Sequence, residues 1–130
     1  MQKSLKTEFL GVTITSPLVL PAGVMGMAFS GFNISIKNGA GIVTSKSLTL
    51  KPRTGHKGPV VAEFEGGLLN CMGLCNPGIV DGIAEIDEFK KRSSIPVIAS
   101  VFATNIKDFI KLTKHVNKSH ADFLDRKSVV

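Results

Sequence analysis

Side chains that could hold a ligand occur where short apolar runs of this sequence end. The runs LVLPAG, GIVTSKSL and IPVIASVF contain, near their ends, Pro21-Ala22-Gly23, Ser45-Lys46-Ser47 and Ala99-Ser100. Short apolar runs of this kind are typical of strands buried on both faces of a parallel sheet. Because parallel strands present their carboxyl ends at one edge, where α/β proteins bind ligands, the sequence predicts a site that includes a lysine and several serines.

The stretch GGLLNCMGLCNPG, residues 66–78, is a second candidate. Its four glycines, two asparagines and one proline argue against a plain helix or strand. It is nevertheless too apolar for a solvated loop, because it contains Leu68, Leu69, Met72 and Leu74. It closes a linker over 49–78, which is too long for a bare connection and in which VVAEF is expected to form a short extra strand. We expect the loop to cover a ligand, with its apolar residues underneath and its asparagines directed at the ligand.

The elements that would position these residues follow one another as strands and helices. Residues 5–20 predict a small hairpin leading into a strand, and a short helix is expected over 30–37, stopped by Asn38-Gly39. Strands are expected over 41–48 and 95–102, and ADFLD opens a fourth. A helix is expected over about 79–92, where Ile79, Ile83, Ile86 and Phe89 form one apolar stripe.

A last helix is expected to run to about residue 118. Asn105 and Asp108 resemble an N-terminal capping pair, and the helix is expected to bury Ile106, Phe109, Ile110 and Val116. Strands that alternate with helices predict a parallel sheet with right-handed crossovers. Two architectures fit this order: an open doubly wound sheet, or part of a (β/α)8 TIM barrel.

Composition narrows the function classes. The net charge of +6 comes with scattered lysines and without an arginine-rich arm, so we expect no nucleic-acid partner. Cys71 and Cys75 lack a companion pair, and we expect no metal site. No secretory signal or membrane-spanning run is visible, which favours a cytoplasmic protein with no membrane partner. The stretch GVMGMA has the wrong glycine spacing for a dinucleotide fingerprint.

Three stretches carry a resemblance to a known family: LVLPAGVMG, GIVTSKSLTLKPRTGHKGPVVAEFEGGLLNCMGLCNPG and IPVIASVFA. From about Leu10 to Leu124 the chain resembles the class 1 dihydroorotate dehydrogenases. The specific part is K-x-x-T-x-x-P-R-x-G followed by N-x-M-G-L-x-N-P-G. A sister branch, the pyrimidine-reducing domain of dihydropyrimidine dehydrogenase, shares some of these motifs.

The resemblance implies a (β/α)8 barrel that holds FMN at the carboxyl ends of its strands. In the family, dihydroorotate gives a hydride to the flavin and a proton to a side-chain base, which yields orotate in pyrimidine biosynthesis. The resemblance implies contacts to FMN from Ala22, Gly23, Lys46, Ser47 and Ser100. It implies contacts to the substrate from Lys46, Asn70, Cys71, Met72, Gly73 and Leu74. We interpret Cys71 as a small, partly buried filler, because no histidine partners it by motif.

The chain departs from the family pattern after Leu124. Asp125 stands at the family's glutamate, Arg126 and Lys127 replace a leucine and an asparagine, and Val130 falls at the catalytic cysteine. We therefore assign no catalytic residue, and we interpret residues 1–130 as one incomplete domain that departs from the family over 125–130. A frameshift or truncation would explain this, and the coding DNA tests it. The third and fourth strands would expose an open edge and apolar faces, so we expect an inactive chain prone to association.

Three functional hypotheses remain open. The first is an N-terminal fragment of a dihydroorotate dehydrogenase, and the second is a related dihydropyrimidine dehydrogenase-type flavoprotein. The third is a non-catalytic half-barrel that pairs with itself or with a complementary chain. Possible partners are dihydroorotate or orotate, an electron-transfer subunit in the parent enzyme, and further copies in a homo-oligomer. The sequence leaves the electron acceptor open.

Overall fold

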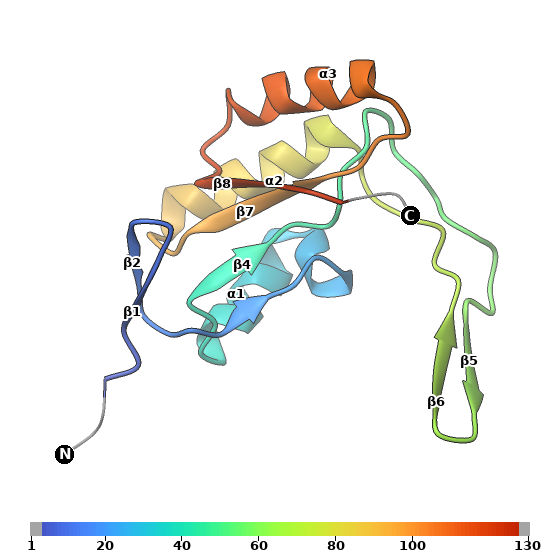
Figure 1. The fold of residues 1–130 in the computed structure, drawn as a ribbon, viewed down its shortest axis with the longest axis horizontal. Coiled ribbons are helices and arrows are strands. Elements are labelled where there is room, and N and C mark those ends of the chain that lie inside the picture. The colour runs from blue at the N-terminus through green and yellow to red at the C-terminus, as the bar shows by residue number, and fades with distance from the viewer. Residues whose placement is uncertain (1–3, 128–130) are drawn as a thin grey trace.

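A four-stranded parallel sheet organises the computed structural model, which describes residues 4–127 (Figure 1). Its strands are β3 (Val19–Leu20), β4 (Ile42–Thr44), β7 (Val97–Val101) and β8 (Phe123–Arg126), in the order β3-β4-β7-β8. Every neighbouring pair is parallel, as the alternation of strands and helices predicts. The sheet fits part of a (β/α)8 barrel.

The open edges of the sheet differ from the expectation. Strand β7 pairs with β4 on one side and β8 on the other, so within residues 4–127 the edges are β3 and β8. The expectation of an open edge is therefore right for the fourth strand and wrong for the third. Strand β8 is a largely exposed edge that includes Arg126, and the arginine guanidinium lies 5.3 Å from the centre of the Phe109 ring.

Three helices cover one face of the sheet: α1 (Phe29–Lys37), α2 (Ile79–Arg92) and α3 (Ile106–Val116). The core between the helices and the sheet contains Phe32, Ile86, Phe89 and Leu112 from the helices, and Val43, Val97, Ala99 and Val101 from the strands. The rings of Phe32 and Phe89 meet edge to face with centroids 5.3 Å apart. The apolar stripe predicted for α2 lies in this core, with Ile83 half-buried at its margin.

Helix α3 turns a different side to the core than the sequence predicts. Leu112 and Val116 are buried, whereas Ile106 and Ile110 are 77% and 51% exposed. The prediction is wrong for both isoleucines because α3 packs on α2 and β7 through the Leu112 side. The predicted cap is confirmed, since the Asn105 side chain accepts a hydrogen bond from the Asp108 N–H.

The two remaining sheets are hairpins. Strands β1 (Thr7–Phe9) and β2 (Val12–Ile14) form the predicted first one, and the Phe9 ring meets the Phe123 ring of β8 at 5.4 Å. Strands β5 (Val61–Phe64) and β6 (Gly67–Asn70) form the second, which projects away from the body (Figure 1). Strand β5 confirms the short extra strand expected at VVAEF, whereas β6 contradicts the expectation that residues 66–78 form no plain strand. No helix within residues 4–127 has the length and apolar character needed to span a bilayer.

Candidate functional site

A cavity of about 720 Å³ brings together most of the residues predicted to bind a ligand. It is bordered by residues that follow β3, β4 and β8 and by the long connection from β4 to α2. Its lining includes Ala22, Gly23, Lys46, Asn70, Cys71, Met72, Gly73 and Leu74 from the prediction, together with Arg53, His56, Val61 and Lys127. The predicted clustering of Lys46 with the Asn70–Leu74 segment at one site is therefore present in the structure.

Lys46 is held by its backbone. Its N–H donates to the Gly26 carbonyl at 2.7 Å, and the residue as a whole is 9% exposed. Gly26 lies in a 3-10 turn, η1 (Val24–Met27), that packs directly on the backbone after β4. A Cβ atom on Gly26 would lie 2.8 Å from the Lys46 nitrogen and would also collide with the Thr44 carbonyl. The sequence motif around Gly26 is thus a packing contact that fixes Lys46.

The predicted serines lie outside the cavity lining. Ser47 and Ser100 are buried, and their hydroxyl oxygens are 3.0 Å apart. The Ser100 hydroxyl donates to the Asp125 carboxylate at 2.8 Å, so its oxygen accepts the Ser47 proton. Ser45 accepts from the Ser100 N–H at 3.0 Å. These bonds tie β4, β7 and β8 together beside Lys46, and a contact from Ser47 or Ser100 to a cofactor stays a prediction.

Hydrogen bonds join the segment that carries Arg53 to the base of the segment that carries Asn70, and we call this contact the clasp. Arg53 and Asn76 exchange two backbone hydrogen bonds of 2.9 Å, and the His56 N–H donates to the Met72 carbonyl at 3.3 Å. Gly73 has a positive φ of 70°, and a Cβ atom there would lie 2.7 Å from the His56 nitrogen. Only glycine allows both this conformation and this approach.

Asn76 is the centre of the clasp. It is 3% exposed, and its Oδ1 accepts from the N–H groups of Thr49 at 3.1 Å and Gly78 at 2.9 Å. Its Nδ2 donates to the Leu74 carbonyl at 2.8 Å. The side chain therefore joins the end of the β4 segment, the cavity wall and the start of α2. The expectation that the asparagines are directed at a ligand is wrong for Asn76, whereas Asn70 lies in the cavity lining and its contact with a ligand stays a prediction.

The apolar residues of the loop divide into two groups. Met72 and Leu74 are half-buried and line the cavity, whereas Leu68 and Leu69 are 67% and 64% exposed on β6. The prediction that all four lie beneath a ligand is wrong for the two hairpin leucines, because β5 and β6 pair with each other away from the sheet. Cys71 is exposed in the lining, which contradicts its interpretation as a partly buried filler.

Basic residues dominate the charge of the cavity. Lys46, Arg53, His56 and Lys127 line it, and no aspartate or glutamate is found in the lining among residues 4–127. A concave site lined by one sign of charge favours a ligand of the opposite sign. Neither Arg53, which lies in the P-R-x-G motif, nor His56 was among the residues predicted to bind a ligand. No group of three potential metal ligands occurs within residues 4–127.

A parallel sheet with a cavity near the carboxyl ends of its strands is the arrangement in which α/β proteins usually bind ligands. The family model described as "Dihydroorotate dehydrogenase" matches residues 4–125, and the chain belongs to that family. Val130, which the resemblance aligns with the catalytic cysteine, lies outside the described residues.

Relatives carry the name "Dihydroorotate dehydrogenase B (NAD(+)), catalytic subunit". The protein of Methanocaldococcus jannaschii is 36% identical over 117 residues, which are 88% of this chain and 38% of the relative. That of Pyrococcus furiosus is 40% identical over 116 residues, with the same two shares of 88% and 38%. That of Thermoplasma acidophilum is 35% identical over 123 residues, 93% of this chain and 40% of the relative. The chain thus spans about two fifths of the length of these relatives.

Proposed function

We propose that this chain forms the N-terminal part of the barrel of an FMN-dependent dihydroorotate dehydrogenase, which oxidises dihydroorotate to orotate in pyrimidine biosynthesis. The observation that carries the proposal is the single cavity that unites Lys46 with Ala22, Gly23 and the Asn70–Leu74 segment. The resemblance implies the same residues as contacts of FMN and substrate, and the chain belongs to the matching family.

The donor set fits the ring end of a flavin and an orotate-like ligand. The reduced flavin and the substrate carboxylate are both anionic, and the described residues of the lining offer cations and no aspartate or glutamate. Asn70 adds an amide that can donate to and accept from a pyrimidine ring. In (β/α)8 barrels the phosphate site is frequently formed after strands 7 and 8. The residues described here are therefore proposed to hold only the ring end of FMN.

The proposed roles follow from the position of each group. Bound FMN would supply the acceptor for the hydride of dihydroorotate. Lys46, fixed through its backbone by Gly26, would hold an ammonium next to the anionic ligand. Asn70, steadied by the clasp at Asn76, would orient the pyrimidine ring. Domain 1–130 would supply these binding groups without the proton acceptor, because valine stands where the family has its cysteine. We therefore expect binding without turnover.

The partners of the parent enzyme are part of the same proposal. The relatives are named as catalytic subunits and as NAD(+)-dependent. We infer that electrons leave the flavin of the parent through an electron-transfer subunit toward NAD(+). A half-barrel that associates without catalysis is the second candidate, and it is favoured by the exposed β8 edge and by the exposure of Ile106 and Ile110.

Flavin retention tests the binding proposal. The purified chain is incubated with FMN, passed through gel filtration and examined for a flavin absorbance band that shifts when orotate is added. We expect Lys46→Ala to weaken retention or the orotate response about tenfold to a hundredfold, since a hydrogen bond to a charged group contributes about 1.5–3 kcal/mol. Lys114→Ala, on the exposed part of α3, is the matched control. Absence of retained flavin, or equal retention by both variants, would contradict binding at this cavity.

A further inference from the structure

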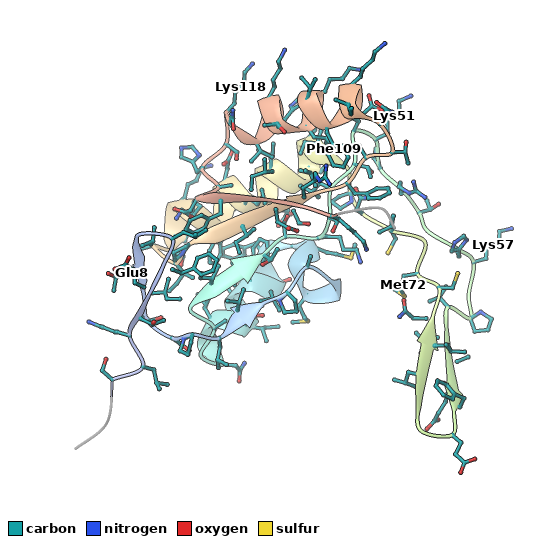
Figure 2. The ribbon with its side chains drawn as sticks, in the orientation of Figure 1. Glu8, Lys51, Lys57, Met72, Phe109 and Lys118 are labelled. Carbon is teal, nitrogen blue, oxygen red and sulfur yellow. The ribbon has the colours of Figure 1, made fainter. Side chains whose placement is uncertain are left out.

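Cys71 places an exposed thiol in the lining of the cavity. Its N–H donates to the Val60 carbonyl at 2.8 Å, so a backbone hydrogen bond fixes the thiol's position just after β6. Figure 2 shows the next residue, Met72, at the base of the hairpin, where β6 leads back to the body of the molecule. Because the thiolate of a cysteine is a strong nucleophile, an electrophile that enters the cavity can be captured there.

Lys46, a second and independent feature of the cavity, indicates which electrophiles would enter it. The residue is only 9% exposed, and within residues 4–127 its ammonium takes part in no ion pair or side-chain hydrogen bond. No fully buried side-chain nitrogen or oxygen of the described residues lacks a partner, so the ammonium keeps open surface, and that surface faces the cavity that Lys46 lines. An ammonium without a counterion in a concave basic site attracts an anion.

We propose that Cys71 is a site of covalent modification by small anionic electrophiles, which carry a carboxylate or a phosphate next to a reactive carbon. Lys46 and the other cations of the lining attract the anionic group, and the thiolate sulfur attacks the carbon. With iodoacetate as the probe, a sulfur–carbon bond forms and the carbon–iodine bond breaks. Iodide leaves with the bonding electron pair, and the thiol proton goes to solvent. The proposal goes beyond the proposed function and depends on neither flavin nor orotate, so failure of flavin retention would leave it standing.

Cys75 provides an internal comparison in the same segment. It is half-buried and lies outside the cavity lining. A Cβ atom on Gly55 would lie 2.9 Å from the Cβ atom of Cys75, so Cys75 packs against the Gly55 backbone. The two cysteines are therefore neighbours in one loop, but only Cys71 shares the cavity with the Lys46 ammonium. A preference for anionic reagents that comes from the cavity should occur at Cys71 alone.

Alkylation by iodoacetate and by neutral iodoacetamide, with mass spectrometry to assign the modified cysteine, tests the proposal. The ratio of the two rates at one cysteine cancels its fraction of thiolate, because both reagents attack the same sulfur. At low ionic strength we expect this ratio to be about tenfold higher at Cys71 than at Cys75. The difference should vanish in concentrated urea and shrink in about 1 M salt, where the Debye length is about 3 Å. Equal ratios at the two cysteines of the folded chain overturn the proposal.

Lys46→Met tests the source of the selectivity, because methionine keeps an unbranched side chain without the charge. We expect the ratio of rates at Cys71 to fall about fivefold. Lys118→Met is the matched control, since Lys118 is exposed and lies far from Met72 (Figure 2), and it should leave the ratio unchanged. Circular dichroism checks that each variant is folded, and the comparison of Cys71 with Cys75 in the unsubstituted chain needs no variant. An unchanged ratio in folded Lys46→Met, or an equal fall in Lys118→Met, overturns the role of Lys46.

Discussion

Two parts of the connection between β4 and α2 are built in opposite ways. At its base, Asn76 is 3% exposed, and its amide is bonded to Thr49, Leu74 and Gly78. At its far end, the β5–β6 hairpin exposes Leu68 and Leu69 by 67% and 64%. One connection thus contains a segment held by buried polar bonds and a segment held by little beyond its own strand pairing.

The difference shows how a long connection can serve two purposes. The base lines the cavity together with Lys46, and hydrogen bonds from the Asn76 side chain and the His56 N–H hold its backbone. The strands of the hairpin have their main contacts with each other, and Leu68 and Leu69 are left exposed. Substitutions at the base are therefore expected to lower the free energy of unfolding much more than substitutions in the hairpin.

The largest effect is expected at Asn76. Asn76→Leu leaves the N–H groups of Thr49 and Gly78 and the Leu74 carbonyl without their partner. Each unsatisfied buried group costs about 1–3 kcal/mol, so we expect the free energy of unfolding to fall by about 3 kcal/mol. Urea denaturation measures this loss.

Asn76→Asp tests the contribution of the amide nitrogen separately from that of the amide oxygen. It keeps an oxygen acceptor for Thr49 and Gly78 but replaces the donor to Leu74 with a second oxygen. We expect an intermediate loss of stability. Asn70→Ala is the control, because Asn70 is exposed and should affect ligand binding without affecting unfolding. Equal stability of Asn76→Leu and Asn70→Ala would remove the contrast between base and tip.

A smaller effect is expected at the turn that supports Lys46. Gly26→Ala places a Cβ atom 2.8 Å from the Lys46 nitrogen, and backbone must move to relieve the overlap. Overpacking of this kind costs about 1–3 kcal/mol, and we expect about 2 kcal/mol in thermal or urea unfolding. Gly58→Ala is the matched control, because a Cβ atom there meets nothing within 4 Å. If Gly26→Ala left the free energy of unfolding unchanged, the site would tolerate a shift of Lys46.

The sequence predicted the elements well where one local pattern decided them. The stripe of Ile79, Ile86 and Phe89 placed α2, and Asn105 placed the start of α3. The parallel order followed from alternation, and the motif residues Lys46 and Asn70 were assigned to one site, which the cavity contains. These features depend on periodicity, on capping or on a motif, all of which are written in consecutive residues.

The failures have a common physical cause, which is packing between distant segments. The buried side of α3 depends on where α2 and β7 lie, so periodicity alone could not choose Leu112 over Ile106. The role of Asn76 depends on Thr49, which is far away in the sequence. The tripeptide Asn76-Pro77-Gly78 before α2 indicated a structural role in a turn for Asn76. An asparagine in a turn and an asparagine that binds a ligand cannot be distinguished by sequence alone.

The short connection between β7 and α3 contains an exposed helix cap, Asn105. Hydrogen bonds from the Asn105 side chain, and then from Lys111, lower the pKa of Asp108. A depressed carboxylate pKa contributes stability above the pKa of the unfolded chain, and this contribution is lost as pH falls through the folded pKa. Asn105→Ala should cost about 1 kcal/mol near neutral pH through loss of the cap. Part of that deficit should disappear as pH falls from the pKa of an unfolded aspartate, about 3.9, through the lower pKa of folded Asp108, below which the carboxyl is protonated in both variants.

Urea unfolding of both proteins near neutral pH and below about pH 4 tests this sign. A deficit that grows on acidification would mean that Asn105 does not stabilise the ionised Asp108. Thr104→Ala, next to the cap and exposed, is the control and should change little at either pH. We expect Asn105→Ala to lower the free energy of unfolding less than Asn76→Leu does, because Asn105 is an exposed cap and Asn76 is buried.

The smallest effect is expected on the hairpin itself. Leu68→Ser replaces a side chain that is 67% exposed, so unfolding of the dilute chain should change by no more than about 0.5 kcal/mol. Urea denaturation of Leu68→Ser beside the unsubstituted chain measures this change. A loss of several kcal/mol in dilute solution would instead place Leu68 in the core of this chain, and the contrast between clasp and hairpin would then be wrong.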